Sequence, residues 1–178
     1  MTRKPVARAA VALACAAALM SCGSPPTTTE DATVPETSRE PGVPLCGDSQ
    51  DALRSTGSLT LAGEFPTSAS RSATTVEGTV TVTNTGAPMQ GDTSPLADVF
   101  VVREGRIVAT PAPKDLIAQP FDLTTDAEAR FPATADLHAC AGGGPLPPGT
   151  YELYAVVSVV QGVNTVHATG GPYRLDIT

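Results

Sequence analysis

This chain of 178 residues has no tryptophan, only 4% aromatic residues, two histidines and few basic side chains. A hydrophobic core must therefore be built mainly from Val, Leu, Ile and Ala. The 11 Lys and Arg are outnumbered by 18 Asp and Glu, which gives a formal net charge of −7. This balance argues against a nucleic-acid partner, because that affinity comes mainly from neutralising phosphates with Lys and Arg. It also argues against electrostatic adsorption to anionic lipid.

The chain also lacks an apolar run long enough to form a transmembrane helix. The longest run, Ala9 to Met20, is shorter than the ~18 residues that span a bilayer. A basic segment precedes this run, and the small residue Ser21 follows it. A basic start, a short apolar core and a small residue before the cleavage point are the parts of an export signal. We therefore expect residues 1–21 to be a signal peptide.

The stretch Leu19-Met20-Ser21-Cys22 resembles the lipobox of bacterial lipoproteins. The resemblance implies that Cys22 is linked to a diacylglycerol and becomes the first residue of the mature protein. Its acyl chains would hold the protein on the extracytoplasmic face of the cell membrane. The alternative is an ordinary cleaved signal with a chance cysteine. Removal of the signal leaves eight basic residues against 18 acidic ones, a net charge of −10.

Residues 22–44 are rich in Pro, Thr, Ser and Glu and contain almost no large apolar side chains. Such a segment cannot bury enough apolar surface to offset the ordering of its backbone, so we expect it to be disordered. A coil of this length spans roughly 25 Å, which suits a tether. Residues 45–178 are then long enough for one domain with a core, and too short for two.

Two cysteines, Cys46 and Cys140, remain in the mature domain. Exported proteins meet an oxidising compartment, so we predict that the two form a structural disulfide. The bridge would close a span of 94 residues (140 − 46), worth about 4 to 5 kcal/mol in the chain-entropy model. A metal pair or a redox couple is the alternative, although neither a CxxC spacing nor a nearby histidine other than His138 supports it.

Most of the mature domain has a hydrophobic period of two, which predicts half-buried β-strands. Glu104-Gly105 predicts a tight hairpin, and Gly170-Gly171 predicts a bulge in the last strand. Lys114 to Gln119 suits one helical turn that Pro120 would end. The expected strands are Leu59–Phe65, Val76–Thr83, Asp98–Val102, Ile107–Ala109, one or two in Phe121–Ala139, Tyr151–Val160 and Thr165–Ile177.

Seven or eight short strands separated by turns predict an all-β domain, an antiparallel immunoglobulin-like β-sandwich. The stretch Leu146 to Tyr151 supports this fold, because a turn followed by Tyr at the start of a penultimate strand is typical of a tyrosine corner. A plain Pro-Gly turn with a core tyrosine is the alternative interpretation of this stretch.

Three stretches resemble the bacterial intracellular proteinase inhibitor family, and they occur in that family's order. They are Val80 to Gly86, Asp98 to Val108, and Leu146 to Tyr151. The resemblance implies an immunoglobulin-like fold, and it makes the loop from Gly142 to Pro148 a candidate reactive segment. The export signal, the cysteine pair and the absence of Trp depart from the family's pattern.

The sequence offers no recognisable catalytic set, so we expect no enzyme, no catalytic residues, no metal site and no cofactor. A nucleophilic hydrolase needs a nucleophile beside an oriented base, and the only histidines are His138 and His167. The expected function is a non-catalytic interaction module for an unidentified protein or glycan. Alternatives are protease inhibition and carbohydrate or calcium binding through a loose acidic group, Asp122, Asp126, Glu128 and Asp136.

Overall fold

The computed structural model describes residues 44–178, which form an all-β domain with one short 3-10 helix, η1. The predicted signal peptide, Cys22 and nearly all of the tether lie outside these residues. The elements are η1 (Gln50–Ala52), β1 (Leu59–Glu64), β2 (Ser68–Ala69), β3 (Thr75–Asn84), β4 (Met89–Thr93), β5 (Ala97–Arg103), β6 (Arg106–Ala109), β7 (Gln119–Leu123), β8 (Glu128–Asp136), β9 (Gly149–Gln161) and β10 (Asn164–Ile177).

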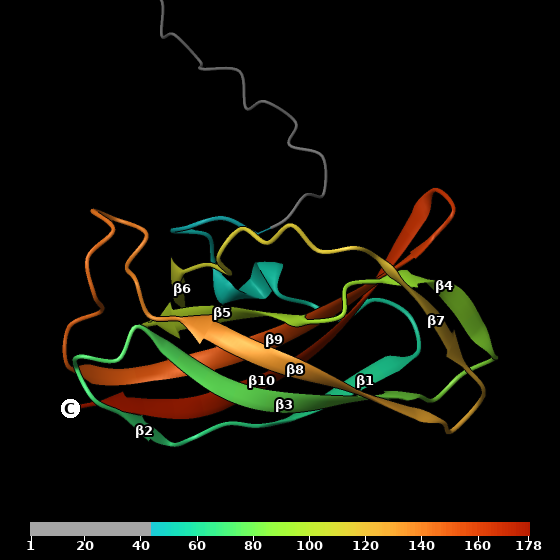
Figure 1. Cartoon of the computed structure of the whole chain (residues 1–178), viewed down its shortest axis with the longest axis horizontal. Helices are drawn as coiled ribbons and strands as arrows, with labels where there is room; N and C mark the ends of the chain where they lie inside the picture. The colour runs from blue at the N-terminus through green and yellow to red at the C-terminus, as the bar shows by residue number, and fades with distance from the viewer. Residues whose placement is uncertain (1–43) are drawn as a thin grey trace, which may run out of the picture. The chain divides into compact units, whose positions relative to one another are not determined.

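The strands of the described domain make one ten-stranded mixed sheet that curls into a half-barrel (Figure 1). Its main order is β1-β3-β8-β5-β9-β10-β2, while β4 pairs with β7 and β9, and β6 pairs with β5. The prediction of an all-β domain is confirmed. The expectation of only antiparallel pairs is wrong, because β5 pairs in parallel with β8 and β10 pairs in parallel with β2.

The alternating pattern of the sequence places one face of each main strand in the core. In β9, every second residue from Tyr151 to Val159 is buried, and its neighbours are partly exposed. In β3, Val76, Val80 and Val82 are buried in the same way. The largest fully buried side chains include Tyr151, Phe100 and Leu59, so aliphatic residues and a few aromatic rings fill the interior, as expected.

Two turn predictions are confirmed. Glu104 and Gly105 have φ angles of 53° and 75°, the left-handed pair that a type I′ hairpin requires between β5 and β6. The pairing of β9 with β10 shifts register between Gly170 and Tyr173, which is the bulge expected there. Both features could be predicted from the sequence because the conformation of a turn or bulge depends mainly on the residues that form it.

Glycines allow close approach beside β1. A Cβ on Gly170 of β10 would collide with Leu61 of β1, and one on Gly78 of β3 would collide with the ring of Phe65, which follows β1. The ring of Phe65 lies 5.2 Å from that of Tyr173, centroid to centroid. The Leu61–Gly170 and Phe65–Tyr173 contacts thus place β1 and the residue after it against β10.

The predicted helical turn at Lys114 to Gln119 is wrong. Residues 110–118 carry no regular secondary structure, and Gln119 and Pro120 belong to β7. The residue before a proline is disfavoured in the α region, and Pro111, Pro113 and Pro120 each impose this restriction. The prolines thus disfavour a helical turn in and after this segment.

The predicted disulfide between Cys46 and Cys140 is present, with Cα atoms 5.8 Å apart. The backbone on both sides of the bridge is hydrogen-bonded to β6. Gly47 N donates to Ile107 O at 2.8 Å, and Cys140 N donates to Val108 O at 2.8 Å. The disulfide and these hydrogen bonds thus hold the start of the domain and the loop after β8 against β6.

Candidate functional site

The outer face of β5 and β9 is covered in two different ways along its length. These antiparallel neighbours align Phe100 with Tyr154 and Asp98 with Val156. At the Phe100 end, residues from η1's C-cap and from β6 form a small second core. We call this the sealed end; its buried members are Leu53, Phe100, Val102 and Ile107.

Residues 110–118, which we call the strap, connect β6 to β7 and contribute to the cover of the other half of this face. No backbone group of the strap hydrogen-bonds to another backbone group within residues 44–178. Two of its apolar side chains face solvent: Leu116 is 40% exposed and Ile117 is 90% exposed. The strap is therefore held mainly at its two ends.

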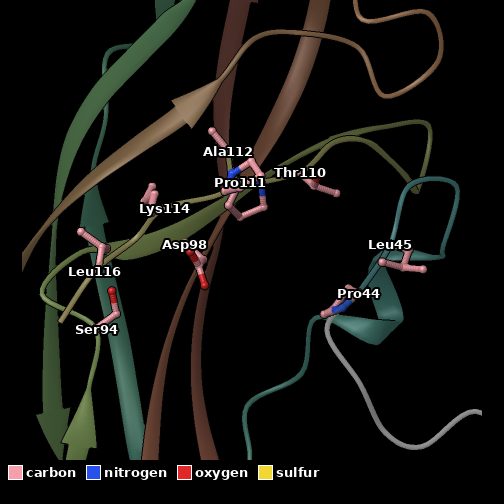
Figure 2. Close-up of a pocket in the computed structure, with 10 residues that line it drawn as sticks. Pro44, Leu45, Ser94, Asp98, Thr110, Pro111, Ala112, Lys114 and Leu116 are labelled. Carbon is pink, nitrogen blue, oxygen red and sulfur yellow. The ribbon is translucent and has the colours of Figure 1, made fainter. Parts of the chain in front are cut away.

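A groove lies between the strap, β5 and the start of the described chain. It consists of two adjoining pockets of about 410 and 230 Å³, which share Ser94, Asp98 and Leu116. Figure 2 shows Asp98 at the larger pocket, with Leu116 on one side of it and Pro44 and Leu45 on the other. The smaller pocket extends towards Val160 of β9.

Two oppositely charged side chains line this groove without pairing. Burial raises the pKa of the Asp98 carboxyl above its usual range, and the charge of Lys114 opposes this shift. The Nζ atom of Lys114 is buried and has no hydrogen-bond partner. Buried ammonium groups without acceptors are costly, so this atom is the most unusual polar group of the described domain.

The rest of the groove is largely apolar. Leu45, Leu116 and Val160 are 52%, 40% and 44% exposed, and Pro111 and Pro113 add rigid apolar walls. No aromatic ring lines either pocket. The larger pocket thus offers apolar contact together with the Asp98 carboxylate, the Lys114 ammonium and the hydroxyls of Ser94 and Thr110, and the smaller pocket adds the carboxylate of Asp92.

The structure does not bring the two histidines into one site. His138 Nδ1 lies 2.6 Å from Asp136 Oδ1, and His167 Nδ1 lies 2.9 Å from Ser158 Oγ. Ser158 also lines the smaller pocket, and it faces His167 across the β9–β10 ladder. The sequence pattern missed this pair, because its formation depends on strand register. Within residues 44–178 no carboxylate hydrogen-bonds to His167, so a third, orienting group is missing there.

The four acidic residues singled out by the sequence are spread over β7, β8 and the turn between them. Asp122 accepts a hydrogen bond from Gln90 Nε2 at 3.2 Å, and Asp136 is paired with His138. Across residues 44–178, no group of three or more His, Cys, Asp or Glu is placed to hold a metal ion. In the same range, no helix is both long and apolar enough to cross a membrane.

The loop from Gly142 to Pro148 is fixed at both ends. Cys140 precedes it with the disulfide, and Tyr151 Oη donates to Pro147 O at 2.6 Å after it. This hydrogen bond has the geometry expected of a tyrosine corner. The side chain of Leu146 is buried, whereas Gly142 and Gly143 are exposed and Gly144 is half-buried.

No family model matches the chain, and no curated protein matches it in sequence. Its structure has distant similarity to β-rich domains. The sporulation control protein Spo0M of Bacillus subtilis has 19% identity and a TM-score of 0.39, over 68% of this chain and 50% of Spo0M. The CARDB domain of a Pyrococcus furiosus protein, in complex with di-metal ions, has 20% identity and a TM-score of 0.34, over 67% and 91%.

A β-glucosidase from Listeria innocua in complex with isofagomine has 11% identity and a TM-score of 0.37, over 67% of this chain and 16% of the enzyme. The chain thus spans half the length of Spo0M and a small part of the glucosidase. The likeness in each case concerns strand-rich architecture, and no activity transfers with it.

Proposed function

We propose that this protein is a bacterial lipoprotein, anchored to the extracytoplasmic face of the membrane through lipid on Cys22, and that its β domain binds a protein partner without catalysis. The sequence Leu19-Met20-Ser21-Cys22 after a short apolar core supports the anchor. The tether of residues 22–44 then places the domain away from the lipid surface.

The observation that carries the binding role is the groove itself. A stable domain normally packs its apolar side chains together, and the sealed end of the same face does so. The groove instead exposes Leu45, Leu116 and Val160, and it contains an ammonium group without a hydrogen-bond partner. Clustered exposed apolar side chains with a few polar groups are typical of interaction sites.

We further propose that the curled sheet is a variant of the immunoglobulin-like sandwich. The hydrogen bond from Tyr151 to Pro147 supports this assignment, since it ties the penultimate long strand to the turn before it. In such folds the binding surfaces are commonly loops and edges supported by a rigid sheet. The strap has this arrangement over β5 and β9.

The anchor and the binding face are tested separately in intact cells. Labelled palmitate should enter the wild-type chain and be absent from Cys22→Ser; an unlabelled wild type would contradict the anchor.

A photo-crosslinking residue at position 117 should give one discrete adduct that Leu116→Asp removes. The matched control is position 79 on β3, where Thr79 is also exposed. Equal adducts from both positions, or none from position 117, would contradict the binding face.

A second candidate function, protease inhibition, is favoured by the pinned loop. The disulfide at Cys140 and the Tyr151–Pro147 hydrogen bond hold both ends of a segment in which Gly142 and Gly143 are exposed. Rigid presentation of a loop is what binding to a protease cleft demands. A mixing assay against a panel of extracellular proteases tests it, and full residual activity of every protease would remove this candidate.

A further inference from the structure

We infer that the groove accommodates an extended, largely uncharged polypeptide segment, one of whose peptide groups bridges Asp98 and Lys114. The peptide N–H donates to the Asp98 carboxylate, and the peptide C=O accepts from the Lys114 ammonium. This inference rests on the proposed binding function and specifies the chemistry of the partner at that site.

The two charges in the larger pocket select a neutral ligand group that both donates and accepts. Asp98 and Lys114 line the same pocket, yet Lys114 Nζ has no hydrogen-bond partner, so the two are not joined directly. A cationic ligand would be attracted by Asp98 and repelled by Lys114. An anionic ligand would be attracted by Lys114 and repelled by Asp98. A peptide group satisfies both without adding net charge to a poorly hydrated site.

The walls of the groove favour a polypeptide over a sugar. A glycan hydroxyl also donates and accepts, but no aromatic ring lines either pocket to stack on a sugar face. Instead the walls are Leu45, Leu116, Val160 and prolines. The two pockets adjoin through Ser94, Asp98 and Leu116, so a ligand larger than either pocket can occupy both.

The strap adds a second source of main-chain recognition. Its backbone makes no backbone hydrogen bond within the described residues, and residues 110–118 form no helix, strand or turn. An extended ligand lying alongside can pair with such groups, as peptides do when they add to a strand edge. Main-chain pairing then supplies affinity, and the apolar pockets select side chains.

The test uses the full-length lipidated protein in detergent micelles, panned against a displayed library of short random peptides. The best binder is synthesised with blocked ends and titrated calorimetrically. We expect Lys114→Met and Asp98→Val each to weaken binding by about tenfold or more, because each removes a hydrogen bond to a charged group. Asp98→Asn, which keeps an acceptor oxygen, should weaken it less. Glu77→Gln on β3 is the matched surface control and should leave affinity unchanged.

The bridging geometry is tested by N-methylating the peptide one amide at a time. Methylation of one particular amide should weaken binding of the peptide to the wild type about tenfold. The same methylation should not weaken binding to Asp98→Val any further, since the two changes remove the same hydrogen bond. Additive losses at every position would overturn the bridge. Circular dichroism and thermal melting of each variant distinguish lost binding from lost folding.

The outcomes separate this inference from the proposed function. If the adduct from position 117 forms but no library peptide binds the wild type better than Leu116→Asp, the binding face stands and the extended-peptide ligand is wrong. If neither the adduct nor peptide binding is found, the proposed function itself fails. Unchanged affinity in both Lys114→Met and Asp98→Val overturns the inference alone.

Discussion

The two halves of the outer face of β5 and β9 share the same strands and differ in how they are covered. At the sealed end, Phe100 and Val102 are 2% and 0% exposed beneath Leu53 and Ile107. The segment there is also tied by backbone bonds to β6 and by the disulfide. At the groove, the cover is a strap without backbone pairing, and the face beneath it carries Asp98.

This difference shows that one sheet face supports both stability and recognition. Apolar burial and backbone pairing at the sealed end lower the free energy of the folded state. The groove leaves apolar side chains exposed and the Lys114 ammonium without a hydrogen-bond partner. This arrangement lowers the stability of the free protein and leaves these groups available to a ligand. Substitutions at the two ends should therefore have opposite consequences, and the following predictions test this.

The largest effect is expected from loss of the disulfide beside the sealed end. Replacing Cys46 and Cys140 by Ser opens a loop of 94 residues and should lower the free energy of unfolding by about 4 to 5 kcal/mol. Urea denaturation measures it. Reductant should destabilise the wild type and have no effect on the double variant; equal sensitivity of both proteins would contradict the prediction.

A paired truncation compares the two ends directly. Phe100→Ala should cost about 3 to 5 kcal/mol of stability, because it empties a packed site at the sealed end. Leu116→Ala at the groove should change stability by less than about 0.5 kcal/mol, since Leu116 is 40% exposed. Denaturant midpoints at equal slope measure both. Similar costs would show that the groove is packed as part of the core.

Lys114→Met should raise stability, in contrast to most substitutions. The side chain is replaced by an apolar one of similar length, and a buried ammonium without an acceptor is removed. We expect a gain of about 1 kcal/mol, since the residue as a whole is only half-buried. Thermal unfolding measures the shift. A loss of stability would mean that the ammonium already has a favourable partner in the free protein.

The smallest effect concerns pH. Burial raises the pKa of the Asp98 carboxyl above its usual range, so the folded state favours the protonated carboxyl more than the unfolded chain does. This contribution to stability is present below the ordinary carboxyl pKa and is lost as pH rises through the raised value. Asp98→Asn should therefore be slightly more stable than the wild type at neutral pH, and the difference should vanish in acid. A constant difference across this window would exclude the titration as its cause.

Much of the fold follows from local patterns in the sequence. The alternation of Val and Thr in β3, the left-handed pair at Glu104-Gly105 and the bulge after Gly170 each depend on neighbouring residues alone. The disulfide followed from the oxidising compartment and from the pairing of the two remaining cysteines.

Features that depend on distant contacts were missed. Strand β4 has a glycine at its centre and little alternation, and its pairing with β7 and β9 alone defines it. The two parallel pairs depend on the path of the chain between strands. The groove was invisible for the same reason, because Leu45, Asp98 and Lys114 come from three separated segments. In the strap, the prolines were readable, and a helical turn was wrongly preferred.

The position of the cystine has a mechanical consequence. Asp98 and the strap lie within the covalent ring that Cys46 and Cys140 close, whereas Leu45 and Val160 of the groove lie outside it, and Cys46 lies two residues after Pro44, where the described chain begins. A pulling force between Cys46 and a ligand held by Asp98 and the strap therefore divides over two covalent paths, one through each arm of the ring. Both arms of the ring carry this force together, so neither arm unfolds by itself under the full load.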